Sequence, residues 1–129
     1  MRHGLPFALA TTVLALAPCL AAAQTIQRPF PATALRGVVA VGQPPEISVN
    51  GRPARLAPGA RIRAQNNMLA LSASLMGERF AAHYTIDIDG NVKDIWILTS
   101  DELARRPWPS TPEEAARWRF DPVAQVWSR

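Results

Sequence analysis

Cysteine is almost absent from this sequence of 129 residues. The only cysteine, Cys19, lies inside an apolar N-terminal segment. If that segment is removed after Ala23, the remaining chain from Gln24 to Arg129 has no cysteine at all. Disulfides, thiol catalysis and cysteine-based zinc sites are then excluded. A hydrophobic core must therefore hold the fold together.

Long apolar segments are also scarce. The segment Leu5–Leu20 is about 16 residues long, which is short of the ~20 residues that span a bilayer. Arg2 provides a basic start, and Ala21–Ala23 provides the small residues that precede signal cleavage. The pattern predicts a signal peptide over residues 1–23 and a periplasmic or secreted protein, with a membrane anchor as the alternative. A lipoprotein signal at Cys19 is disfavoured, because a proline precedes the cysteine.

The rest of the chain is predicted to form one small domain made mainly of β-strands. Residues 24–32 are proline-rich and predict a flexible leader, so the domain covers 33–129. Turn signals recur every 8–12 residues, as in small sandwiches and barrels. Asn50–Gly51 favours a two-residue hairpin turn in which both residues have positive φ. Pro53 follows at once and predicts an edge strand, since proline cannot donate a ladder hydrogen bond.

The stretch YTIDIDGNVKDIWIL, residues 84–98, contains three aspartates around one glycine. A calcium loop needs ligands at fixed positions up to the twelfth, and the twelfth position, counted with Asp87 as the first, is Leu98. Two strands joined by a two-residue turn at Asp89–Gly90 account for the stretch better. Alternation then places Ala82, Tyr84, Ile86 and Ile88 on the core face and His83, Thr85 and Asp87 on the solvated face.

The C-terminal part changes to helix signals. Residues 99–102 match a capping box and predict a short helix to position 106, while 111–119 begin with a second cap followed by proline. The tail 123–129 fits a last strand, and Met68–Met76 is ambiguous between extended chain, loop and helix. We predict a mainly β fold, a small barrel or rolled antiparallel sheet of the OB or SH3-like kind, with one or two short C-terminal helices.

Residues that could carry catalysis are few. His83 is the only histidine after residue 23, and no cysteine nucleophile remains to pair with it. A small periplasmic metal-binding protein or enzyme using His83 is one hypothesis, with Met68 and Met76 as possible copper ligands. Methionines in apolar surroundings more often fill gaps in a core. We therefore expect a non-enzymatic protein without a cofactor.

Two groups of side chains could bind a ligand. Three tryptophans and a phenylalanine near the C-terminus could line a groove, or could anchor the short helices to the sheet: Trp108, Trp118, Trp127 and Phe120. Four arginines around the first hairpin could form a basic sheet face, or simply a solvated edge: Arg52, Arg55, Arg61 and Arg63. For an exported protein, such a face predicts an anionic envelope component or a protein partner, not nucleic acid.

Two runs carry a resemblance to other proteins. VNGRPARLAPGARIR and YTIDIDGNVKDIWILT, which lie within residues 30–99, resemble a group of small exported β-rich proteins of Gram-negative bacteria. The shared motifs are turns and strands, so the resemblance implies a common fold. No activity is assigned to that group, and it therefore implies no functional residues.

The export hypothesis predicts that Met1 to Ala23 are missing from the mature protein. Intact-mass analysis of protein isolated from the cell envelope is expected to give a chain that starts at Gln24. A species that starts at Met1, or a diacylated species that starts at Cys19, would show that the localisation is wrong.

Overall fold

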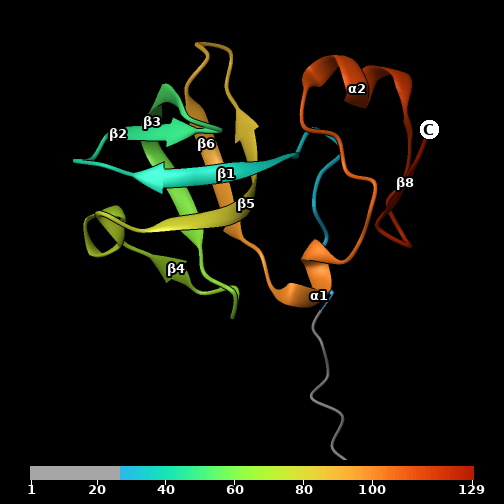
Figure 1. Ribbon diagram of the computed structural model, residues 1–129, viewed down its shortest axis with the longest axis horizontal. Helices are drawn as coiled ribbons and strands as arrows, with labels where there is room; N and C mark the ends of the chain where they lie inside the picture. The colour runs from blue at the N-terminus through green and yellow to red at the C-terminus, as the bar shows by residue number, and fades with distance from the viewer. Residues whose placement is uncertain (1–26) are drawn as a thin grey trace, which may run out of the picture.

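The structure, a computed structural model, describes residues 27–129 (Figure 1). The larger sheet consists of β1 (Leu35–Val41), β2 (Glu46–Val49), β3 (Arg52–Arg63), β4 (Leu69–Ala70), β5 (Arg79–Ile86) and β6 (Val92–Ile97). The other elements are the 3-10 helix η1 (Ser72–Leu75), α1 (Ser100–Leu103), α2 (Pro112–Arg117), β7 (Arg119–Asp121) and β8 (Val126–Ser128). The predicted signal peptide lies outside the described residues.

Five strands close into a barrel in the order β1-β2-β3-β6-β5, because β1 pairs with β5 and β2 with β3. The predicted small β barrel with short helices is confirmed, and this strand order is that of an OB-type Greek-key barrel. One pair, β3 with β6, is parallel. The strand β5 lies between these two in the sequence and runs in the opposite direction to both. The edge position predicted from Pro53 is wrong for β3 as a whole, which pairs with β2 there and with β6 from Leu56 onward.

The turn between β2 and β3 has the geometry predicted from the Asn50–Gly51 pair. The backbone φ is +52° at Asn50 and +79° at Gly51, as a two-residue turn of type I′ requires. Asn50 also contacts β1, where its Oδ1 accepts a hydrogen bond of 2.9 Å from the N–H of Val38. A Cβ at Gly37 would lie 2.9 Å from the same oxygen, so a larger residue there would displace the Asn50 side chain.

The hairpin of β5 and β6 is also confirmed, but its turn is longer than predicted. The strands are separated by residues 87–91, in which Gly90 has a φ of +83°. The Oδ1 atom of Asp87 accepts hydrogen bonds from the backbone N–H groups of Asp89, at 3.0 Å, and Asn91, at 2.9 Å. Asp87 therefore holds the turn together from inside, which is a structural use for a carboxylate that could have bound calcium.

Apolar side chains that alternate along the strands fill the barrel. This inner core contains Leu35, Val39, Val41, Ile47, Leu56, Ile62, Ala82, Tyr84, Val92 and Ile95. Ala82 and Tyr84 lie inside as predicted, whereas Ile86 and Ile88 are exposed. The core-face prediction fails for these two because β5 ends at Ile86 and Ile88 belongs to the loop beyond it.

A second core lies outside the barrel, where the C-terminal segment and the first described residues cover its wall (Figure 1). Its buried residues are Phe30, Ala34, Trp96, Leu98, Trp108 and Trp127. The prediction that His83 is solvated is therefore wrong, since it is fully buried beneath this cover. A flexible leader is also wrong for Arg28 and Phe30, which are buried, and the Phe30 N–H donates to Oε1 of Gln125 at 2.9 Å.

The predicted helix caps are confirmed. Thr99 and Glu102 form a reciprocal capping box at α1, and Thr111 caps α2, whose first turn contains Pro112. Both helices end earlier than predicted, and the last residues form the strand β8, paired with β7. The ambiguous segment Met68–Met76 contains β4 and η1.

A two-residue Asp89–Gly90 turn would make Asp89 the residue on which the turn depends. In the observed turn this residue is Asp87, whose carboxylate accepts two backbone hydrogen bonds. Asp87→Ala is expected to lower the free energy of unfolding by about 1 kcal/mol, because two backbone N–H groups lose a charged acceptor. The matched change Asp89→Ala, at an exposed side chain, is expected to cost less than about 0.5 kcal/mol. Urea denaturation of both variants measures this. Equal losses, or a larger loss for Asp89→Ala, would contradict the assignment.

Candidate functional site

His83 lies at the centre of the contact between the barrel and the C-terminal segment. Its imidazole stacks on the indole of Trp108, with ring centroids 4.1 Å apart and planes 21° apart. Phe30 meets it edge-on at 4.4 Å. Its Nε2 accepts a hydrogen bond of 3.2 Å from Nε of Arg36. Burial, and then the positive charge of Arg36, lower the pKa of His83 to about 2, so the ring is neutral.

Arg36 extends from β1 to the end of α1 and ties the two together. Its Nη1 donates to the carbonyl of Arg105 at 2.8 Å and, at 3.4 Å, to that of Leu103, while Nη2 donates to the carbonyl of Glu102 at 2.9 Å. These carbonyls lie at the helix end, where backbone acceptors lack helical partners. The guanidinium also lies 5.5 Å from the ring centroid of Trp108. Arg36 is therefore a structural clamp whose donors are largely used.

A buried ion pair lies beside this clamp. Arg28 donates to both carboxylate oxygens of Glu102, from Nε at 2.9 Å and from Nη2 at 2.5 Å. Its remaining donors bond the carbonyls of Ala64 and Ile97, so every part of the guanidinium has a partner. Burial alone would raise the pKa of Glu102, but the hydrogen bonds from Arg28 and Thr99 lower it below its usual value. The carboxylate is thus charged and fully used by Arg28 and the helix cap.

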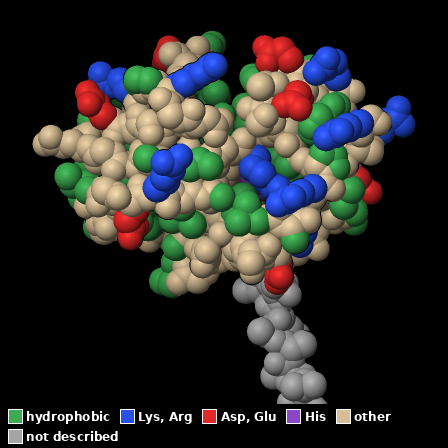
Figure 2. Space-filling model, viewed as in Figure 1, with side chains coloured by type: hydrophobic (Ala, Val, Ile, Leu, Met, Phe, Trp, Pro, Cys, Tyr) green, Lys and Arg blue, Asp and Glu red, His purple; other side chains and the backbone are tan. Residues whose placement is uncertain are grey.

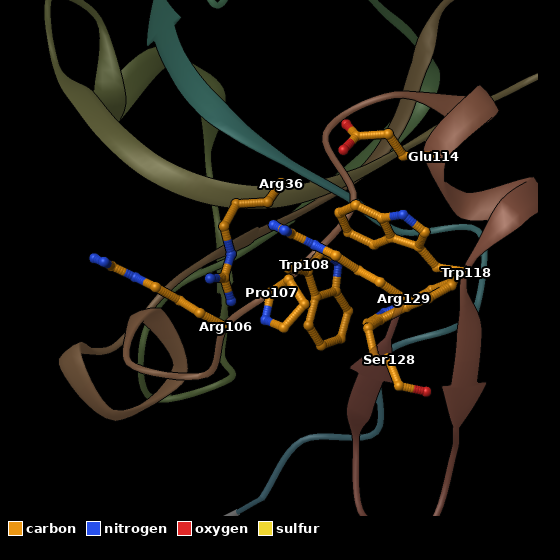
Figure 3. Close-up of a pocket in the computed structure, with 9 residues that line it drawn as sticks. Arg36, Arg106, Pro107, Trp108, Glu114, Trp118, Ser128 and Arg129 are labelled. Atoms are coloured by element: carbon orange, nitrogen blue, oxygen red, sulfur yellow. The ribbon is translucent and has the colours of Figure 1, made fainter.

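An open pocket of about 820 Å³ lies on the solvent side of Trp108, between β1 and the C-terminal elements. Six of its lining residues matter for recognition: Arg36, Arg106, Trp108, Glu114, Trp118 and Arg129. Figure 3 shows the Arg129 side chain extending past Trp118, and its guanidinium lies 5.2 Å from the indole ring centroid. Figure 2 shows several Lys and Arg side chains on the face where the barrel meets the C-terminal segment.

Positive charge at this pocket exceeds the negative charge that could balance it. Burial, and then the charge of Arg106, lower the pKa of Arg36, and only Glu102 acts in the other direction. Glu102 is already paired with Arg28. Within residues 27–129, Arg106 and Arg129 make no ion pair. An anion in the pocket would relieve this excess charge.

Glu114 is the acidic residue that lines the pocket, and local hydrogen bonds occupy it. Its Oε1 accepts from the hydroxyl of Ser110 at 2.9 Å, and its backbone N–H donates to Oγ1 of Thr111, the N-cap of α2. The hydrogen bond from Ser110 lowers the pKa of the carboxyl. Glu114 therefore belongs to the start of α2, and it reduces the positive charge of the pocket only at its rim.

The four arginines predicted from the sequence do not form one face. Arg63 is half-buried: its Nη1 donates to Asp94 at 3.2 Å, and its guanidinium lies 5.2 Å from the ring centroid of Trp96. Arg61 and Arg55 are exposed on the same side of β3 as Arg63, but an irregularity in the pairing with β6 separates them. Because side chains alternate along a strand, the Arg52 side chain lies on the opposite face of β3.

Arg52 lines a different pocket, of about 480 Å³, together with Tyr84 and Ile86.

The residues that sequence reasoning missed are Arg36, Arg106 and Arg129. A signal existed for one of them, because Arg106 belongs to an arginine pair next to Pro107 and Trp108. The two hypotheses for the tryptophans both apply in part, since Trp108 and Trp127 are buried anchors and also line the pocket with Trp118.

Comparison with protein-family models, with curated proteins and with solved structures finds no match to this chain. The resemblance to small exported proteins of Gram-negative bacteria therefore stays a prediction. In residues 27–129, no group of three His, Cys, Asp or Glu side chains is arranged to hold a metal ion. No helix of the described part is both long and apolar enough to cross a membrane.

The buried neutral His83 predicts a loss of stability in mild acid. Unfolded histidine takes up a proton below about pH 6.5, whereas the folded ring stays neutral until about pH 2. The contribution of neutral His83 to the free energy of unfolding is therefore fully present above pH 6.5. Below that pH the free energy of unfolding falls by on the order of 1 kcal/mol per pH unit. Urea denaturation between pH 7 and pH 5 measures this for wild type and His83→Gln, whose amide oxygen can still accept from Arg36. Parallel pH profiles for the two proteins would contradict the prediction.

Proposed function

We propose that this chain is an exported, non-enzymatic protein that binds an anionic saccharide of the cell envelope. The binding site is the open pocket bounded by Arg106, Arg129 and Trp118. One observation carries the proposal: Arg106 and Arg129, which make no ion pair in the described chain, line one pocket together with Trp118.

The chemistry of the pocket defines the ligand. Guanidinium groups donate paired hydrogen bonds to carboxylate or phosphate oxygens, and they keep their charge at any physiological pH. The apolar face of a sugar ring can pack on the indole of Trp118, while acidic substituents along the polymer meet Arg129 and Arg106. An exported protein meets acidic polysaccharides and head groups in the envelope, and it does not meet cytoplasmic nucleic acid. A protein partner with an acidic segment is the alternative that the same charges allow.

A binding role is favoured over catalysis by what surrounds the pocket. His83, the residue on which the enzyme and metal hypothesis depends, is fully buried behind Trp108, and its Nε2 is occupied by Arg36. Ser128 and Glu114 line the pocket, but within the described residues no hydrogen bond joins them into a nucleophile and base. These features support recognition of charge and ring shape.

The decisive experiment compares two pairs of arginines. Binding of polygalacturonate, with neutral dextran as the control polymer, is measured by titration calorimetry at low salt and again near physiological salt. Arg106→Ala with Arg129→Ala is expected to weaken binding at least tenfold, a change of about 1.4 kcal/mol. Arg52→Ala with Arg55→Ala removes the same charge from β3 and is expected to leave binding within about twofold.

The opposite outcome, in which only the β3 pair weakens binding, would move the site to the arginines predicted from the sequence. Equal binding of dextran and polygalacturonate would exclude recognition of charge. Trp118→Ala adds a second criterion, because the loss of the indole removes the packing surface while the charge stays the same. Binding that is unchanged in Trp118→Ala would exclude a saccharide that packs on this ring.

A further inference from the structure

Large apolar side chains are exposed together in one short segment, far along the chain from the arginine and tryptophan pocket. Met68, Leu69, Leu71 and Met76 are 67%, 69%, 78% and 51% exposed. They lie within nine consecutive residues around β4 and η1. Single exposed apolar residues are ordinary on protein surfaces, but exposed apolar side chains that share one face indicate a surface that contacts something apolar.

This segment is held in place with its apolar side chains outward. Leu75 packs against the inner core of the barrel and fixes η1. The Ser74 hydroxyl donates to the carbonyl of Leu71 at 2.6 Å, and the Met68 N–H donates to Oδ1 of Asn66 at 3.0 Å. The exposure of the four side chains is therefore built into the fold and does not come from a loose loop.

The register of β3 with β4 places arginine beside the exposed leucines. Ile62 pairs with Ala70 and Arg63 with Leu69. Because Ile62 is buried in the inner core, its neighbours on either side face outward. Leu69 and Leu71 thus share the outer face of this strand pair with Arg63 and Arg61.

The charge on this outer face is positive. Arg63 is neutralised by Asp94, to which its Nη1 donates at 3.2 Å. Arg61 is exposed, and no residue in the described part of the chain forms an ion pair with it. An exposed guanidinium beside exposed leucine side chains matches the interface of an anionic bilayer, where head groups meet acyl chains.

We propose that Leu69, Leu71 and Arg61, which we call the β4 surface, dock the protein on an anionic lipid membrane. The leucines enter the acyl boundary, and Arg61 contacts lipid phosphate. A second copy paired edge to edge is disfavoured, because β4 has only two residues and offers a short template for strand pairing. This inference concerns a surface separate from the pocket, so it does not depend on saccharide binding.

Vesicle flotation tests the proposal with the mature protein, whose N-terminus is fixed by intact mass. The vesicles are phosphatidylglycerol mixed with phosphatidylcholine, or phosphatidylcholine alone. Wild type is expected to bind the anionic vesicles, and less at high salt. Leu69→Ser with Leu71→Ser is expected to weaken this binding at least tenfold, and Arg61→Glu is expected to abolish the preference for anionic lipid.

The chain offers a matched control at Ile88 and Val123, which are 100% and 88% exposed. Ile88 precedes Val92, which pairs with Leu56, so it lies at the other end of β3 from β4. Ile88→Ser with Val123→Ser removes similar apolar area and is expected to bind vesicles like wild type. The four substituted side chains of the test and control variants are all exposed, so both variants are expected to keep the fold. Circular dichroism checks this.

Three results would overturn the proposal. The first is equal vesicle binding by wild type and the Leu69, Leu71 variant, and the second is an equal loss in the control variant. The third is a wild-type dimer in light scattering that the Leu69, Leu71 changes dissociate, because a second copy would then cover the surface. Polygalacturonate binding is expected to stay intact in these variants, which separates a failure here from a failure at the pocket.

Discussion

The stacking of Trp108 on His83 joins the two parts of this protein. A small barrel has an inner face that its own side chains fill and an outer face that must be wetted or covered. Here the outer wall contains an imidazole with a depressed pKa, which tolerates burial because it is neutral. Trp108 covers it and bonds the carbonyl of Ala34 through Nε1 at 2.9 Å. The rest of the C-terminal segment packs around this contact.

Arginine supplies the polar connections across the same contact. Arg28 and Arg36 both begin near the start of the described chain, and both end at α1, on the Glu102 carboxylate or on backbone carbonyls. Guanidinium suits this task, since its donors spread in a plane and satisfy several acceptors at once. Arg28 and the helix cap use the Glu102 carboxylate completely. Arg106 and Arg129 form no ion pair within residues 27–129, and the pocket that they line keeps an excess of positive charge.

Features encoded by neighbouring residues were the ones that could be predicted. The Asn50–Gly51 turn needs positive φ at both positions, and the capping box at α1 needs only Thr99 and Glu102 three residues apart. Features that depend on distant residues could not. His83 alternates correctly onto the outer face of β5, yet that face is buried, because residues from both ends of the described chain meet over it.

The sequence by itself determined the mainly β class, the Asn50–Gly51 turn, the helix caps and the scarcity of catalytic side chains. These depend on backbone preference and on composition, which act over a few residues. Only the tertiary structure decided which arginines form ion pairs within residues 27–129. Arg63 is neutralised by an aspartate from another strand, whereas Arg106 and Arg129 are brought together from separate segments. The interaction between two charges depends on their distance in space, and the spacing of the residues along the chain does not predict that distance.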